Sequence, residues 1–345
     1  MSQRPTSGRS RAHTVVAASI GFVLVAGVGI AAALAGQDAG PPVPSAVNST
    51  ATSESSPRPT KRTATPKPRQ SDRLTGGAAS NNPVIAVKVD NIAAALPQVG
   101  LHAADIVFAQ EVEGGQTRLI AVYHTRFPRR LGPVRSARTT DDQLLPMFGK
   151  PGLVYSGANR RVQRKINSAS IVPIPRTTRD SRRPVPHNVF VSLRAIAASA
   201  AAGKAKPIGW SFLRHDQRWA AAPAARNPKT RVGQDTFNFE YGGGHYLVRW
   251  NGRQYADGDT GKITKTDNVV IMSVQNRPDG NRDVNGVPSV RSETVGHGRV
   301  TIYRDGKKMT GSWQRASVSA PLQFRDGSGR DIALAPRKTW VNLQG

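Results

Sequence analysis

The pattern of apolar and polar positions divides the chain into three parts. Residues 14–36 contain no charged side chain and are rich in Val, Ile, Leu and Ala. This length suits an α-helix that crosses a bilayer, since a helix rises about 1.5 Å per residue. Residues 37–82 are rich in Pro, Ser and Thr and contain no aromatic side chain, so we expect a disordered linker there. The remaining chain alternates short apolar runs with turn residues, which indicates a folded body.

The first part of this body mixes the apolar patterns of strands and helices. Apolar runs at 84–89, 105–112 and 117–124 predict strands, and the Gly pair in Glu113–Gln116 predicts a hairpin between the last two runs. Three segments show helical periodicity: 141–148, 160–168 and 191–202. The mixture predicts an α/β or α+β domain over residues 83–222.

The second part contains six Asn-Gly or Asp-Gly dipeptides, which supply the positive φ angles that tight hairpins require. The strand-like runs between them are 246–250, 268–274, 299–303, 309–313 and 339–343. We therefore expect a mostly β domain over residues 226–345. The Pro/Ala-rich segment 220–225 is the expected joint between the two domains.

The N-terminus predicts that the body is exported. Residues 1–13 contain three Arg and no acid, and no Lys or Arg follows the apolar segment until Arg58. The positive-inside rule places 1–13 in the cytoplasm and the body outside. Ala33–Ala35 also resembles a signal-peptide cleavage site, so the protein is either a single-pass cell-membrane protein or, if cleaved, a secreted one. The chain lacks Cys, which excludes disulfides, thiolate metal sites and a lipid-accepting cysteine.

The formal net charge is +27, and this excess predicts an anionic partner. An exported body does not meet nucleic acid, so we expect no nucleic-acid partner. The expected partners are an anionic envelope component (a lipid-linked phosphate, a wall polymer or a peptide carboxylate) and the membrane itself, through residues 14–36. No cofactor is expected, and no His, Asp and Glu spacing matches a metal site.

The densest polar cluster is Gly132–Arg138. If the chain is helical there, Arg135 and Arg138 share a face, and their paired guanidinium groups suit bidentate binding of phosphate or carboxylate. The alternative is a solvated pair of surface arginines.

Further candidates lie in and around the predicted strands. Asp90 follows an apolar strand, where binding groups of α/β sheets collect, or it is a turn residue. Glu113 is a candidate base or metal ligand, and Arg118 is the expected partner that keeps it ionised. His187 follows two prolines in a basic segment and is either a general acid or base or a structural loop residue. Its neighbour Asn188 is a candidate ligand-binding residue.

Several of these segments together resemble the bacterial YerB-like family, a family of unknown function named after a lipoprotein. The resemblance rests on Ile85–Asn91, Ala104–Val107, Val112–Gly115 with Thr117 and Arg118, Gly132–Arg138, Pro186–Phe190, Asn268–Val270, Gly298–Trp313 and Thr339–Val341. It implies a two-domain extracytoplasmic protein and supplies no established reaction. The lipidated cysteine of the lipoprotein pattern is missing, so the apolar segment is the expected anchor.

The order of elements from Asp90 to the Arg135–Thr139 turn is also similar, by analogy, to the LytR-CpsA-Psr phosphotransferases. These attach glycopolymers to the wall from polyprenyl-phosphate carriers. We therefore expect a non-catalytic, membrane-tethered envelope protein that binds an anionic ligand through Arg118, Arg135 and Arg138. The alternatives are an envelope phosphotransferase acting on a polyprenyl-phosphate-linked glycan and a structural assembly factor, and the sequence does not decide whether a reaction is catalysed.

Overall fold

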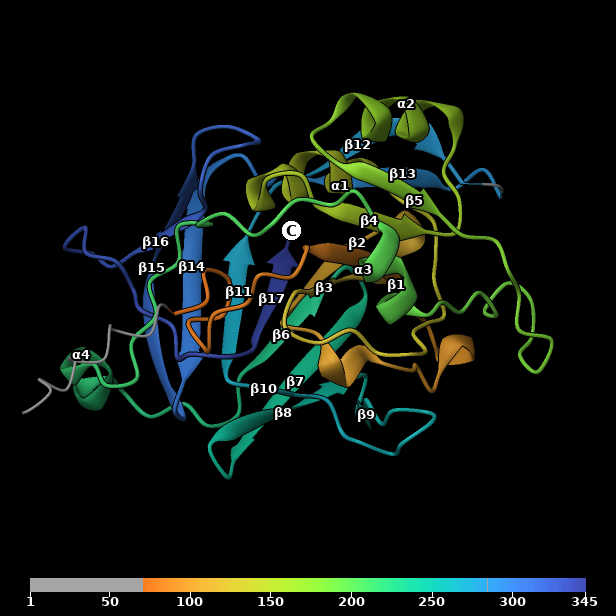
Figure 1. The fold of residues 1–345 in the computed structure, drawn as a ribbon. Coiled ribbons are helices and arrows are strands. Elements are labelled where there is room, and N and C mark those ends of the chain that lie inside the picture. Colours follow the sequence, from red (N-terminus) through yellow and green to blue (C-terminus); the bar gives the residue numbers. More distant parts are fainter. Residues whose placement is uncertain (1–70, 284) are drawn as a thin grey trace, which may run out of the picture. The chain divides into compact units, whose positions relative to one another are not determined.

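The computed structural model describes residues 71–283 and 285–345 (Figure 1). The expected cytoplasmic segment 1–13, the apolar segment 14–36 and most of the linker lie outside the described residues. Among the residues that are described, no helix combines the length and the apolar character that crossing a bilayer requires.

One large mixed sheet of ten strands organises the fold (Figure 1). Its strands, in spatial order, are β16 (Gln323–Arg325), β15 (Lys307–Arg315), β14 (Gly296–Arg304), β11 (Asn268–Ser273), β17 (Thr339–Gln344), β2 (Ile106–Glu111), β3 (Thr117–Tyr123), β1 (Ile85–Asn91), β4 (Gly152–Tyr155) and β5 (Val172–Pro175). The last strand, β17, lies between β11 and β2 and is parallel to both. Strands from the two expected domains therefore belong to the same sheet.

Two smaller sheets accompany the large one. The first contains β6 (Lys229–Val232), β7 (Asp235–Gly242), β8 (His245–Trp250), β9 (Arg253–Gln254) and β10 (Lys265–Thr266), and the second is the hairpin of β12 (Asn276–Arg282) and β13 (Pro288–Ser292). Asn251 and Asp305 have positive φ angles of 47° and 53° and are each followed by a positive-φ glycine. The prediction of tight hairpins at these two dipeptides is confirmed, since both central residues adopt the left-handed conformation.

In the described part of the chain, helices are few and short. They are α1 (Thr139–Leu144), α2 (Arg160–Ser168), α3 (Leu193–Ser199) and α4 (Gln217–Ala221), with the 3₁₀ turns η1 (Ala93–Ala95), η2 (Leu101–Ala103), η3 (Glu113–Gly115) and η4 (Leu145–Phe148). The side chain of Asn159 caps α2 by accepting a hydrogen bond from the Val162 amide at 2.8 Å. The prediction of a mixed α/β fold with mostly strands in its C-terminal part is confirmed.

The large sheet separates two apolar clusters, because alternate residues of each strand point to opposite faces. Ala86, Phe108 and Ile120 belong to the cluster on one face, whereas Val87 and Leu119 belong to the cluster on the other face. Both clusters draw residues from the two expected domains. The two expected domains therefore share both hydrophobic clusters, one on each face of the large sheet.

The folded body begins earlier than the expected boundary at residue 83. Leu74, inside the expected linker, is fully buried. The nearby Asp72 side chain accepts hydrogen bonds from the amides of Leu74 and Thr75 at 3.0 and 2.9 Å. The buried Leu74 and the hydrogen bonds of Asp72 show that this segment is ordered. The Pro/Ser/Thr-rich composition of the linker gave no indication of these two residues.

Candidate functional site

The predicted site residues lie at one edge of the large sheet. Because β1, β2 and β4 share a direction, their carboxyl ends meet at this edge. Arg118 on β3 is the cross-strand neighbour of both Asp90 on β1 and Gln110 on β2. Apolar strands therefore end in a group of polar side chains, as in many binding sites of α/β sheets.

The arginine-rich segment lies in extended form across this edge. The Arg135 amide donates to the Lys88 carbonyl at 2.9 Å, and the Arg135 carbonyl accepts from the Ser156 amide at 3.0 Å, so the segment lies between the ends of β1 and β4. Gly132, with φ 156°, makes this path possible, because a Cβ there would lie 2.6 Å from the Val189 carbonyl oxygen. The condition under which Arg135 and Arg138 would share a helical face is not met, because α1 begins at Thr139 and Arg138 is extended.

Four ion pairs hold the charged groups of the site. Asp90, which is almost fully buried, places Oδ2 2.6 Å from Nδ1 of His187 and 3.2 Å from Nε of Arg135. The carboxylate of Glu113 binds Arg138 in bidentate fashion, at 2.5 Å to Nε and 2.8 Å to Nη2.

The fourth pair is buried more deeply. Lys88 Nζ lies 2.8 Å from Asp141 Oδ1, and both side chains are inaccessible to solvent. Burial lowers the pKa of Lys88 to about 8, the Asp141 carboxylate opposes this shift, and the charges of Arg118 and Arg138 add to it. Burial is the main cause of the shift, and the two arginine charges are smaller contributions.

Arg118 differs from the other arginines because it is buried without a matching partner. Its exposed fraction is 7%, and its Nη1 has no hydrogen-bond partner among the described residues. Burial lowers the pKa of Arg118 to about 10, and the positive charges of Arg138 and Arg135 add to the effect, while Asp90 and Glu113 oppose it. The neighbouring Gln110 is fully buried, and neither polar atom of its side chain has a partner in the described chain.

The ionic partner of Glu113 differs from the expected one. Burial raises the pKa of Glu113, but the hydrogen bonds and the charge of Arg138 more than offset burial and hold that pKa below its usual value. Arg118 contributes only a smaller Coulombic effect. Arg138, not Arg118, therefore keeps Glu113 ionised.

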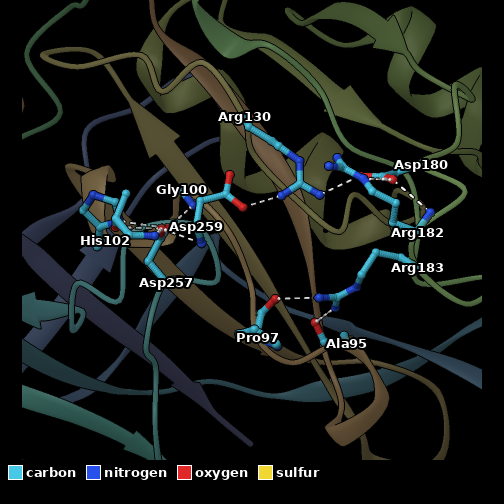
Figure 2. Close-up of polar contacts among 11 residues, drawn as sticks. Ala95, Pro97, Gly100, His102, Arg130, Asp180, Arg182, Arg183, Asp257 and Asp259 are labelled. Atoms are coloured by element: carbon cyan, nitrogen blue, oxygen red, sulfur yellow. Dashed lines mark hydrogen bonds and ion pairs between the residues drawn. The ribbon is translucent and has the colours of Figure 1, made fainter.

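The loop that carries His187 is fastened to the rest of the molecule on two sides (Figure 2). Arg130 places Nη2 2.7 Å from Asp180 and Nη1 2.5 Å from Asp259. Arg183 Nη2 donates to the Ala95 carbonyl at 2.8 Å. These contacts position His187 beside Asp90.

Asn188 lies in the same loop and is buried, with an exposed fraction of 3%. Its Oδ1 accepts a hydrogen bond from Arg179 Nη1 at 2.7 Å, and its carbonyl accepts from the Asp180 amide. The side-chain oxygen of Asn188 therefore stabilises the loop by binding Arg179.

The structure brings together six of the seven predicted site residues: Asp90, Glu113, Arg118, Arg135, Arg138 and His187. Sequence reasoning missed Lys88, Gln110 and Asp141. Lys88 carries a signal that could have found it, because it is the charged residue within an otherwise apolar strand run and shares a face with Asp90. In the part of the chain that the structure describes, no group of three or more His, Asp or Glu side chains is arranged to hold a metal ion.

Comparisons with known proteins agree with this architecture. Residues 72–206 match the family model described as "Protein of unknown function (DUF3048) N-terminal domain", and residues 227–341 match that of the C-terminal domain. The chain is 28% identical over 283 residues to "Putative lipoprotein YerB" of Bacillus subtilis (strain 168), covering 75% of this chain and 80% of that protein. The resemblance to the YerB-like family is confirmed.

A solved structure shares the fold. The crystal structure of the YerB protein from Bacillus subtilis matches this chain with a TM-score of 0.65 and 21% identity. The match covers 79% of this chain and 96% of that one. At this identity the likeness concerns the fold alone.

Proposed function

Because the chain belongs to the DUF3048 family, we propose that it is an extracytoplasmic envelope protein that binds a phosphate- or carboxylate-bearing ligand at the carboxyl edge of its large sheet. The B. subtilis relative is named a putative lipoprotein, which supports an extracytoplasmic location of the folded body. The chain has no cysteine to accept a lipid, so the proposal assigns anchoring to the apolar residues 14–36.

The observation that carries the proposal is the buried guanidinium of Arg118 amid the other cations, whose Nη1 has no hydrogen-bond partner among the residues that the structure describes. Leaving a buried polar group without a partner costs about 1–3 kcal/mol. The cluster contains four basic groups, Lys88, Arg118, Arg135 and Arg138, against the carboxylates of Asp90, Glu113 and Asp141. An added anion would balance the remaining positive charge and accept the unused hydrogen bonds.

Arg135 is the group best placed to meet such a ligand. About a fifth of its side chain (21%) is exposed, and its Nη1 makes only a long contact of 3.4 Å with the Pro186 carbonyl. A guanidinium with free donors binds phosphate or carboxylate oxygens through two parallel hydrogen bonds. Arg135 would therefore contact the ligand first, with Arg118 behind it.

Identifying what co-purifies with the full-length protein tests the proposal. Native mass spectrometry of the wild-type protein should show a bound anionic species, and Arg135→Ala should reduce its occupancy at least tenfold, because about 1.4 kcal/mol of lost binding corresponds to that factor. Arg160→Ala is the matched control, since Arg160 is an exposed arginine at the start of α2. Equal occupancy in both variants would place the ligand elsewhere.

A second candidate function, an envelope phosphotransferase, draws support from the Asp90–His187 pair. A carboxylate 2.6 Å from Nδ1 fixes an imidazole so that Nε2 can exchange a proton with a substrate. In this candidate His187 is the general base, and the arginines neutralise phosphate charge. Turnover of a lipid-pyrophosphate-linked glycan that is lost in both His187→Gln and Arg135→Ala would support it, whereas binding without turnover would support the ligand-binding function.

A further inference from the structure

A basic hollow lies at the amino ends of β11 and β17, opposite the end of the large sheet that carries the arginine cluster. Its volume is about 460 Å³, within the usual range of small-ligand sites. Asp267 and Lys338, which line it, immediately precede β11 and β17. The carboxyl ends of these strands point toward the arginine cluster, so the two places are separated by the length of the strands.

The cations of this hollow have little anionic compensation. Lys262, Lys265 and Arg337 line it, and none of them forms an ion pair in the described part of the chain. The acid in its lining is Asp267, and both of its oxygens are engaged. Oδ1 lies 2.9 Å from Nδ1 of His245, and Oδ2 accepts from the Lys338 amide at 2.9 Å.

Two histidine rings in the wall are held in fixed positions by carboxylates. His102 places Nδ1 3.0 Å from Asp257 Oδ2 (Figure 2), and His245 makes the corresponding contact with Asp267. Asp257 is itself fixed by the amides of Gly100 and Thr260. A carboxylate bound at Nδ1 orients an imidazole and leaves Nε2 for another partner.

The backbone at Arg337 is strained where it enters the hollow. Arg337 has a φ of 111°, a conformation that residues with a side chain rarely adopt and that typically costs about 1–3 kcal/mol. Its side chain is exposed, so packing of that side chain does not explain the conformation. The next residue, Lys338, donates a hydrogen bond from Nζ to the His102 carbonyl. This bond holds the rim of the hollow in place.

From the hollow, its three cations without an ion pair among the described residues and its two oriented imidazoles, we infer that this is an anion site for a phosphate- or pyrophosphate-bearing group. Lysine ammonium groups bind phosphate as point charges and adapt to its tetrahedral oxygens. The site is independent of the arginine cluster and does not rest on the proposed function.

Calorimetric titration of the full-length protein with pyrophosphate tests this inference. Lys265→Ala and Arg337→Gly should each weaken one class of pyrophosphate site at least fivefold, whereas Arg135→Ala should leave that class unchanged. Lys308→Ala is the matched control, because Lys308 is an exposed lysine on β15 outside the hollow. Equal weakening in Lys308→Ala and Lys265→Ala would show nonspecific attraction to a basic protein and would overturn the inference.

Arg337→Gly also separates a binding role from a structural one. Glycine adopts positive φ without strain, so this variant should have an unchanged or higher Tm while its affinity for pyrophosphate falls. A lower Tm with unchanged affinity would mean that Arg337 serves the fold, and the assignment of the hollow would fail. Citrate, a carboxylate of similar charge, should bind less tightly than pyrophosphate, and the reverse order would contradict the phosphate assignment.

Discussion

At the scale of single residues, some buried charges of this protein are held in pairs that join segments far apart in sequence. Lys88 and Asp141 are separated by 53 positions and contact each other at 2.8 Å. His124 and Asp72 form a second such pair, at 3.0 Å, with both side chains buried. Removing one member of a buried pair typically costs about 3–5 kcal/mol, because the other charge is left without compensation. Such pairs specify where distant segments meet.

The His124–Asp72 pair predicts a pH dependence near neutrality. Burial lowers the pKa of His124, but the hydrogen bond and charge of Asp72 more than offset this and raise the pKa above 6.5. A raised folded-state pKa gives stability that is fully present below the unfolded value and is lost as the pH rises through the folded value. We expect the free energy of unfolding contributed by this pair to fall by on the order of 1 kcal/mol over that interval.

Urea unfolding at several pH values from 5 to 9 would measure this contribution. The difference in stability between wild type and His124→Gln should be largest at pH 5 and should shrink as the pH rises. His297→Gln is the control, since His297 is exposed and has no ion pair in the described chain. A difference that grows with pH would contradict the assignment of the raised pKa.

The sequence predicted some residues of the candidate site and not others, for a physical reason. Local patterns in the sequence pointed to three of them. Asp90 follows an apolar strand run, and Arg135 and Arg138 lie in a dense polar cluster. The pairing of Asp90 with His187 spans 97 positions, and that of Glu113 with Arg138 spans 25. Contacts of this kind depend on how strands and loops are placed in space, which local periodicity does not encode.

At the scale of elements, local chemistry predicted strands such as β1, β11 and β17. It missed β6, β7, β12 and β13, and the Asp279-Gly280 dipeptide lies inside β12 instead of at a hairpin turn. The order of the strands was not predictable. The positive-φ dipeptides at Asn251 and Asp305 specify turns through the conformations of their own residues. The position of β17 between β11 and β2 instead depends on burying both of its faces. The helix expected over 191–202 is shorter, Leu193–Ser199, because little beyond Ile196 on this segment is buried.

The loop carrying His187 should become mobile when its ionic clamp is removed. Arg130 joins Asp180 of this loop to Asp259 and also stacks on Phe190, with Cζ 4.1 Å from the ring centroid. In Arg130→Ala, residues 179–190 should lose protection from hydrogen exchange, because the variant removes the ion pair to Asp180 and the contact with Phe190 that oppose local opening. Strands β1 and β3 should keep their wild-type protection.

Hydrogen-exchange mass spectrometry resolves this effect by segment. Arg176→Ala is the control, since Arg176 is a partly exposed arginine at the start of the same loop, and among the described residues its guanidinium bonds only to the adjacent Pro175 carbonyl. Faster exchange throughout the large sheet in Arg130→Ala would show that this residue supports the whole fold instead of the loop.

At the scale of the whole molecule, the two family segments share their interior. Beside the β17–β2 pairing, buried hydrogen bonds connect them at both faces of the sheet. Tyr255 donates to Asn91 Oδ1 at 2.6 Å, and Thr117 donates to Asp235 Oδ2 at 2.6 Å. Arg315, almost fully buried, donates to the carbonyls of Gln143 and Leu144. Two segments with separate family models thus complete each other's core and polar network.

Separating the segments should therefore unfold both. A fragment of residues 71–206 would expose β2 as an unpaired edge, and residues 227–345 would expose β17 in the same way, with hydrogen-bonding groups and apolar faces open to solvent. We expect each fragment alone to lack cooperative thermal unfolding and the mixture to recover it, as seen by near-ultraviolet circular dichroism. A Gly-Ser insertion between Ala222 and Pro223 is the control, because doubling the length of a connection costs only about 0.6 kcal/mol and keeps every strand pair. Cooperative unfolding of either fragment by itself would show that the shared sheet is dispensable for that half.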